Sequence, residues 1–410
     1  MAVKKNAFYK VYDSSGTYIT TWNVDVISKP SFTWSINGSL GEMNIQLARS
    51  IDDFGETEDV AMFNRVETWI QDGDAVNGIR IHTGFIASYE ININADGKKI
   101  INVHVVSYTV EAEKLVAKDG SGNTTLIYNS YEPADIMKDL LNKMNQTLTY
   151  NSSSIENTDT TVSYTFKYAT FLEAIKKVIE FTPVYWYWYV DSNDLVHLHK
   201  TDFNTIDHTL FIGREAQSIN WLKTVENMYN TVFFLGEDPL YKKYENTGSS
   251  ALYGNLEYRI QDTRVSVAAT ALIVSQKFLD ESDHFEQEVK VVILDNNTSD
   301  GQHGGTKGYD IESLKPGDVM KINHPQKESK ETLWYDDAGN NGNFMWDESF
   351  WDFDIRFSLG IPMQIQSINY QFHKAEVTLS TKLPDISKRI EDVKRNLIVE
   401  QSINVPTIPS

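Results

Sequence analysis

The spacing of apolar and polar positions marks one stretch, residues 130–200, where helix and strand patterns follow each other. A first helix is predicted to begin at Glu132 or Pro133, because proline at the first helical position loses only an amide that has no partner there. A second is predicted after Thr170, which forms the pattern of a capping box with Glu173. Their buried stripes are predicted to be Ile136, Leu140, Leu141 and Met144, and Phe171, Ile175, Val178 and Ile179. Residues 184–190, rich in Tyr and Trp, turn at 191–194 and return at 195–199, which predicts a hairpin.

The regions on both sides of this stretch carry strand patterns. Before it, strands are predicted at residues 7–12, 17–22, 66–71, 79–89 and 99–110. Residues 32–36 and 43–47 flank Asn37-Gly38, a strong turn signal, and are predicted to pair as a hairpin. After it, strands are predicted at residues 230–236 and 286–294, after the turn at 316–318, and in a closing hairpin of 363–370 and 375–380. A helix at 265–279 is predicted to carry Ala268, Leu272, Ser275 and Leu279 on one side.

The predicted fold class is therefore mainly β with an inserted α+β domain. The chain has 410 residues, a length typical of two or three domains. The predicted division is a first β-domain at 1–118, the inserted domain at 119–208, a second β-domain at 209–383 with an aromatic and acidic insertion at 325–356, and a C-terminal helix and arm at 384–410.

The C-terminal helix has one apolar seam. Its members recur at spacings of four, three and four, as in the a and d positions of a coiled coil: Ile386, Ile390, Val393 and Leu397. About two heptads are marginal alone, so the seam needs a partner. Self-association and docking on the body of the protein would both bury it.

Composition narrows the function classes. The formal net charge is -20, from 57 acidic and 37 basic residues, which argues against wrapping nucleic acid because phosphate neutralisation needs clustered Lys and Arg. No signal peptide and no run of about 20 apolar residues is found, so we expect cytoplasmic synthesis and no membrane insertion by this chain. The absence of cysteine excludes disulfides and thiolate metal sites.

Two groups of side chains could bind a metal. His197 and His199 share one face of a predicted strand, with Asp207 and His208 nearby, although a solvated strand face is the simpler interpretation. Residues 337–348 match part of a calcium loop but have glycine at the third position. The candidate calcium ligands are Asp337, Asn341 and Glu348. No cofactor is otherwise expected.

Clustered aromatics are the other candidates. Trp334, Trp346 and Trp351 could form a subunit interface, accompany a calcium site or stack on sugar, and we favour an interface or a packed loop. Tyr185, Tyr187 and Tyr189 could also stack on a glycan. Residues 301–308 are glycine-rich but lack the phosphate-loop order, and no serine nucleophile elbow, zinc-protease helix or kinase signature is present. We therefore expect no enzymatic activity.

The order of these elements resembles the baseplate hub, or tail-tip hub, family of long-tailed phages, which is related to the hub proteins of contractile injection systems. The resemblance covers nearly the whole chain, and each of its segments is a turn or strand signature. They are residues 41–47, 84–86, 171–181, 185–189 and 230–236, the helix through Ala268 and Leu272, residues 316–318, and the closing hairpin.

The resemblance implies a structural virion protein of the phage tail tip, assembled in the host cytoplasm. It implies a homotrimer in which each chain supplies two tube-like β-barrel domains, so that six form a pseudo-sixfold ring with the inserted domain outside or above it. Such a ring would join the sixfold tail tube to the threefold tip. Its partners would be tail-tube and distal tail proteins and a separate spike or fibre protein. DNA would pass without specific binding during genome ejection, repelled by an acidic lumen.

Two other functions remain open. A carbohydrate-binding tail-tip adhesin would use the exposed aromatics at 185–189 or 346–351. A cell-wall glycan hydrolase would need a pair of carboxylates that the sequence cannot select among so many acidic residues. Binding to cell-wall polysaccharides would favour the adhesin, and release of reducing ends would favour the hydrolase.

Overall fold

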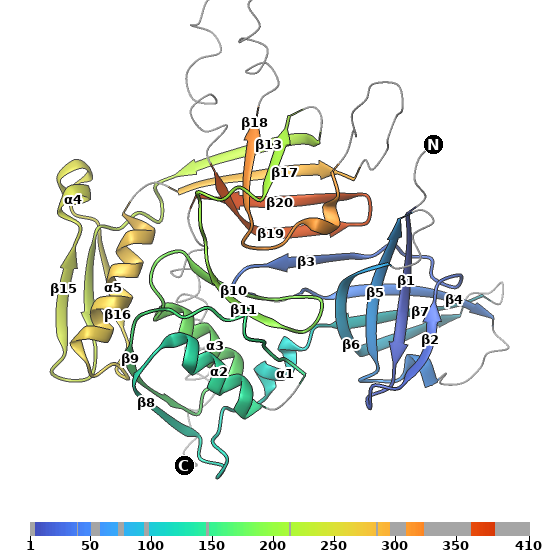
Figure 1. Ribbon diagram of the computed structural model, residues 1–410, viewed down its shortest axis with the longest axis horizontal. Coiled ribbons are helices and arrows are strands. Elements are labelled where there is room, and N and C mark those ends of the chain that lie inside the picture. Colours follow the sequence, from blue (N-terminus) through green and yellow to red (C-terminus); the bar gives the residue numbers. More distant parts are fainter. Residues whose placement is uncertain are drawn as a thin grey trace, which may run out of the picture.

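Two curled sheets and a helix-rich unit make up the structure, a computed structural model of the chain (Figure 1). It describes residues 5–38, 40–50, 58–72, 78–93, 98–144, 147–212, 215–283, 286–295, 309–323 and 362–381. In these ranges the predicted mainly β fold is confirmed, with two curled half-barrel sheets.

The first sheet has six antiparallel strands in the order β2-β1-β5-β6-β7-β4. The strands are β1 (Lys5–Tyr12), β2 (Tyr18–Trp22), β4 (Met43–Ser50), β5 (Arg65–Asp72), β6 (Ile79–Ile93) and β7 (Lys98–Val106). A short helical turn, η1 (Glu58–Val60), precedes β5. The chain leaving β2 crosses to the opposite edge, where Val26 bridges Leu47 and the Ala48 amide donates to the Asp25 carbonyl at 2.7 Å. The sheet therefore curls until its two edges nearly meet.

The second sheet has seven strands and curls in the same way. Its main path runs β12-β18-β19-β20-β17-β13, with β3 paired to β19. The strands are β3 (Ser31–Ser35), β12 (His208–Phe211), β13 (Ala216–Thr224), β17 (Glu286–Leu294), β18 (Val319–Asn323), β19 (Met363–Gln371) and β20 (Lys374–Ser380). The helical turn η2 (Ile311–Ser313) precedes β18. Just beyond β12, Ile212 bridges Ala216 at the start of β13, so the two edge strands approach each other.

The predicted hairpin of residues 32–36 and 43–47 is wrong. The chain does turn at Asn37, whose φ is 51°, and Trp34 bridges Leu40, but β3 pairs with β19 while β4 pairs with β7. The sequence therefore predicts the turn correctly, but the two strands beside it pair with strands of different sheets. β3 thereby links the first region of the chain to the second sheet.

The inserted unit follows the prediction closely. Its elements are α1 (Thr109–Lys114), β8 (Thr125–Tyr131), α2 (Pro133–Met144), β9 (Val162–Lys167), α3 (Phe171–Glu180), β10 (Trp186–Val190) and β11 (Val196–Lys200). The capping box is present: Glu173 N donates to Thr170 Oγ1 at 3.2 Å, and Thr170 N donates to the Glu173 carboxylate at 2.8 Å. Both predicted apolar stripes are buried, and β10 and β11 form the predicted hairpin.

A three-stranded sheet with two helices lies next to this unit. It contains β14 (Thr231–Leu235), β15 (Tyr241–Glu245), α4 (Thr247–Tyr253), β16 (Glu257–Gln261) and α5 (Ala268–Ser282), with strand order β15-β14-β16. The predicted helix at 265–279 is present as α5. Of the four residues predicted on one side of it, Ser275 and Leu279 are buried. Ala268 and Leu272 are exposed, and Leu272 has 47% of its surface accessible. The helix turns Ala271, Val274 and Phe278 towards the strands instead, because that stripe meets the buried side chains of β14 and β16.

The buried side chains fall into two large cores. One joins the two curled sheets, and the other joins the inserted unit to β14, β16 and α5. Residues of the predicted second β-domain, such as Phe234 and Phe278, thus share a core with the inserted unit. The limits at 118, 208 and 383 stay predictions.

Gly317, in the turn before β18, should be intolerant of a side chain. Its φ is 94°, and a Cβ atom there would lie 2.0 Å from the ring of Tyr187 in β10. We expect Gly317→Ala to lower the free energy of unfolding by about 2–4 kcal/mol, because it combines left-handed backbone strain with overpacking. Urea denaturation measures this. The control is Gly120→Ala, where no atom lies within 4 Å. Equal stability of both variants would contradict the packing described.

Candidate functional site

The β10–β11 hairpin lies in the middle of the molecule, with its turn directed at β6 of the first sheet (Figure 1). Thr83 Oγ1 in β6 donates to the Ser192 carbonyl at 2.6 Å, and Ser192 Oγ returns a hydrogen bond of 2.9 Å to the Arg80 carbonyl. The Arg65 guanidinium of β5 forms an ion pair of 3.0 Å with Asp194. These contacts fasten the tip of the hairpin to the first sheet.

The body of the hairpin contacts the chain around β3 and the second sheet. Asn37 pairs with the middle of β10. Its backbone N–H donates to the Trp188 carbonyl, and its side-chain oxygen accepts from Trp188 N at 3.2 Å. Trp34 Nε1 donates to the Val190 carbonyl at 2.9 Å. The hairpin therefore contacts both sheets and forms a joint between them, in addition to the core that they share.

The predicted aromatics of β10 are largely covered. Tyr187 and Tyr189 are each 8% exposed and pack against Ile36 and Trp34, while Trp186 and Trp188 face the helix core. Tyr185 is partly buried and makes an edge contact with Phe203 at a ring distance of 5.3 Å. Every residue of β10 is buried, so Tyr187 and Tyr189 offer no open platform for a sugar.

The predicted histidine site is a hydrogen-bonded strand face. His197 lies 3.2 Å from both Asp191 and His199, and His199 lies 2.7 Å from Glu156. His208 is elsewhere, with Nε2 2.8 Å from Asp318. Within the described ranges, no three or more His, Asp or Glu side chains are arranged to hold a metal ion.

Asp194 is the electrostatic feature that sequence inspection missed. Burial raises the pKa of its carboxyl to about 7, although Arg65 and Arg80 act in the opposite direction. Its side chain is 5% exposed and lies in a turn with φ of 62°. No local signal distinguishes it from the other turn aspartates, because its partners lie in distant strands.

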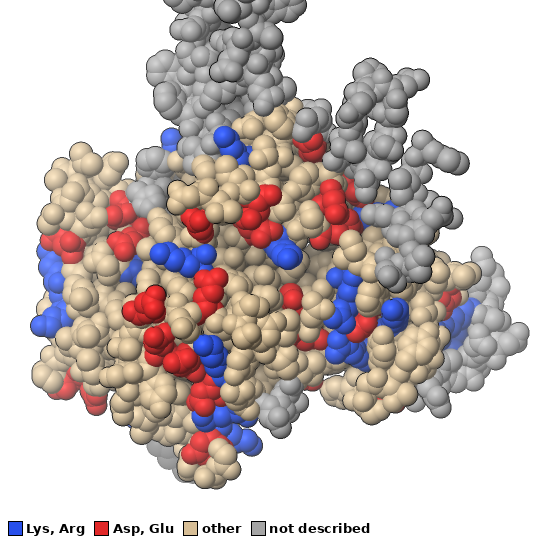
Figure 2. Space-filling model, viewed as in Figure 1, with Lys and Arg blue, Asp and Glu red and all other residues tan. Residues whose placement is uncertain are grey.

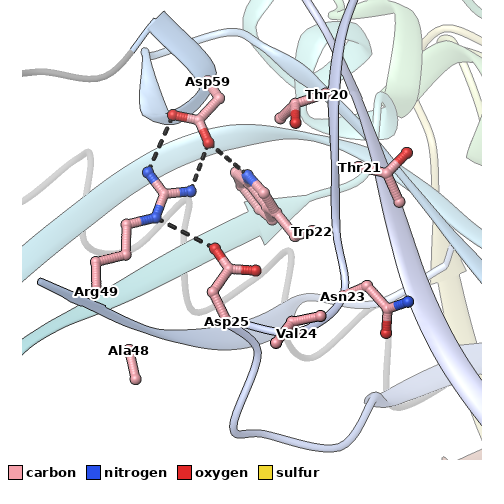
Figure 3. Close-up of a pocket in the computed structure, with 9 residues that line it drawn as sticks. All are labelled: Thr20, Thr21, Trp22, Asn23, Val24, Asp25, Ala48, Arg49 and Asp59. Atoms are coloured by element: carbon pink, nitrogen blue, oxygen red, sulfur yellow. Dashed lines mark hydrogen bonds and ion pairs between the residues drawn. The ribbon is translucent and has the colours of Figure 1, made fainter. Parts of the chain in front are cut away.

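A pocket opens where the first sheet closes on itself (Figure 3). Arg49 forms ion pairs with Asp25, at 3.2 Å, and with Asp59, at 2.5 Å, while Trp22 Nε1 donates to Asp59 at 2.7 Å. The cavity has a volume of about 470 Å³. The guanidinium is held between two carboxylates from the crossing segment and from η1, an arrangement that clamps the curled sheet.

The other predicted site residues lie outside the described residues. They are the tryptophans Trp334, Trp346 and Trp351, the calcium candidates Asp337, Asn341 and Glu348, and the seam Ile386, Ile390, Val393 and Leu397. Their predicted roles stay predictions.

The visible surface carries no dominant charge. Acidic and basic side chains are interspersed on the face drawn in Figure 2. None of the helices in the described ranges is both long and apolar enough to cross a membrane.

Comparison with known proteins places the fold among phage tail proteins. No family model matches the sequence, and no curated protein matches it. The structure is similar to the 43 kDa tail protein of prophage MuSo2 from Shewanella oneidensis, with a TM-score of 0.57, 11% identity, and coverage of 92% of this chain and 98% of that one. A tail protein from Neisseria meningitidis MC58 has a TM-score of 0.56 and 10% identity over 92% of this chain and 96% of its own.

A third similar structure is a prophage tail protein from Listeria monocytogenes EGD-e, with a TM-score of 0.53, 10% identity, and coverage of 95% of this chain and 99% of its own. At such identities the likeness is one of fold. The predicted resemblance to a family of phage tail proteins is confirmed at that level.

Replacing Asp194 should change how stability depends on pH. An unfolded aspartate has a pKa of about 3.9, so between about pH 4 and 7 only the folded state keeps the proton, and stability falls as pH rises. Asp194→Asn mimics the protonated form. We expect it to equal the parent protein near pH 4 and to be about 1–3 kcal/mol more stable at about pH 8.

Urea denaturation across this pH range measures the effect. Asp135→Asn, on the exposed side of α2, is the matched control and should leave the pH slope unchanged. An unchanged slope for Asp194→Asn would mean that its carboxyl titrates normally.

Proposed function

We propose that this chain is a structural hub protein of a phage tail tip or baseplate. Three copies form a ring that joins the sixfold tail tube to a threefold tip and lines the DNA path. The observation that carries the proposal is the pair of curled sheets within one chain, joined by a common core.

Direct contacts between the two sheets hold them in a fixed relative position. Their shared core contains Ile45 and Ile101 from the first sheet and Val291 and Ile365 from the second. Lys5 in β1 forms ion pairs with Asp295, after β17, and with Glu312 in η2. Because the two sheets of a chain are held in a fixed relative position, both can form part of the same ring.

The number of curled sheets in a trimer matches the symmetry of a sixfold tail tube. Three chains with two curled sheets each supply six similar units around one axis, which suits contact with a sixfold tube. The likeness to prophage tail proteins supports a place in the tail. In this arrangement the unit with α2 and α3 lies outside or above the ring, and tail-tube, distal tail and spike or fibre proteins are the neighbours.

Net charge supports passage of DNA without binding. Three chains of -20 each carry -60. Repulsion between a negative wall and phosphate acts within about 8 Å at physiological salt. DNA would therefore slide along the lumen, and a basic or apolar bore would contradict this part of the proposal.

The oligomeric state tests the hub directly. Three chains of 46.8 kDa give about 140 kDa. We expect this mass by light scattering coupled to size-exclusion chromatography, and rings with a central hole by negative-stain microscopy. A mass of one chain at every concentration, even with the tail-tube protein added, would overturn the proposal.

The predicted C-terminal seam is proposed to stabilise the trimer. Ile390→Asp combined with Val393→Asp should weaken self-association at least about ten-fold, because two charges would replace apolar seam positions. The control is Lys394→Gln, beside the seam. Light scattering over a dilution series gives the readout. An unchanged trimer would show that the seam does not join subunits.

A further inference from the structure

The three-stranded sheet β15-β14-β16 has one covered face and one open face. Alternation along the strands turns Val232, Phe234 and Ile260 towards α5, where they are buried. Phe233 and Leu235 of β14 point the other way, together with the odd-numbered residues of β15 and β16. We call this second side the outer face. Figure 1 draws these strands at the left margin of the molecule, with α5 on the side towards the body.

An aromatic pair occupies the outer face. Phe233 and Tyr241 have ring centroids 6.3 Å apart and planes within 15° of parallel. Tyr241 is 58% exposed on the edge strand, and Phe233 is half-buried in the central strand. These two rings can therefore be contacted from solvent, unlike Tyr187 and Tyr189.

Polar side chains surround the pair. Strand register sets Lys243 and Arg259 on either side of Phe233, and Gln261 opposite Leu235. Lys243 pairs with Glu245 at 2.8 Å. The side chains of Glu257, Arg259 and Gln261 are exposed, and none of the three makes a hydrogen bond or ion pair with another described residue. They leave both donors and acceptors available to a ligand.

The charges of the outer face indicate the kind of ligand. Lys243 and Arg259 are balanced by Glu245 and Glu257, so the formal charge of this set is zero. Figure 2 shows Lys and Arg atoms along the same margin, but a polyanion would meet as many carboxylates as cations on this face. A neutral ligand with an apolar surface and many hydroxyl groups needs no net charge on this face to bind it.

We propose that the outer face binds a neutral polysaccharide built of pyranose rings. The C–H face of one sugar ring packs on Phe233 and Tyr241, which combine large apolar area with little side-chain entropy to lose. Arg259, Gln261 and Glu257 exchange hydrogen bonds with its hydroxyls, and such bonds to charged groups are among the stronger ones. The proposal goes beyond the hub function and does not depend on trimer formation.

The test uses the full chain on a microarray of bacterial cell-surface polysaccharides, with chitohexaose and maltohexaose as defined probes. Calorimetric titration then follows the glycans that bind. We expect Tyr241→Ala and Arg259→Ala each to weaken binding about ten-fold or more. Tyr168→Ala is the matched control, because Tyr168 is 77% exposed and lies directly after β9, which belongs to a different sheet. Thermal unfolding verifies that all variants remain folded.

Three results would overturn the proposal. The first is that no neutral glycan binds the full chain. The second is that Tyr241→Ala and Arg259→Ala bind as well as the parent protein. The third is an affinity that falls at least ten-fold between about 50 and about 500 mM NaCl, which would indicate a charged ligand. If the protein is a trimer that binds no glycan, only the glycan proposal fails. If it is a monomer that binds a glycan, only the hub proposal fails.

Discussion

The arrangement of the two curled sheets depends on their common core, which the β10–β11 hairpin reinforces by contacting both of them. A two-stranded hairpin of five-residue strands is marginal alone, since it exposes both faces and both edges. Here one face joins the helix core, the other contacts Trp34 and Gly317, and the tip is hydrogen-bonded to β6. Burial on both faces explains why the strand Trp186–Val190 can be apolar or aromatic at every position. A loss of packing at this joint would remove the contacts that the hairpin adds to the common core of the two sheets.

Buried ionisable groups near this joint respond to pH in opposite directions. Burial lowers the pKa of His82 to about 4. The neutral His82 ring therefore contributes its full stability to the fold above the pKa of about 6.5 that histidine has in the unfolded state, and this stability is lost as the pH falls through 4. Its Nε2 lies 2.8 Å from the Gly41 carbonyl. Asp194, with its pKa raised to about 7, favours folding at low pH instead. The two effects oppose each other between about pH 4 and 7, so together they make the free energy of unfolding depend less on pH.

Local signals in the sequence predicted local structure, and distant partners decided the rest. Pro133 and the Thr170 capping box start helices through contacts within four residues, so the sequence was sufficient. The turn at Asn37 was recognised, but nothing near it states that β3 pairs with β19. Helical spacing placed four residues on one side of α5, but only Ser275 and Leu279 of them are buried, because spacing alone does not say which side meets a sheet. Among site residues, the covered state of Tyr187 and Tyr189 and the pairing of Asp194 with Arg65 depend on elements far away in the chain.

In the proposed hub, one chain presents two curled sheets side by side, and three chains would close a ring of six. Single-particle cryo-electron microscopy of the full chain tests it most directly. We expect a threefold ring with six β-lobes in three pairs, each pair bridged by a β10–β11 hairpin, and with the α2 and α3 unit outside the bore. Particles in which each chain contributes only one sheet to the ring, or in which the two sheets of a chain lie apart, would contradict it.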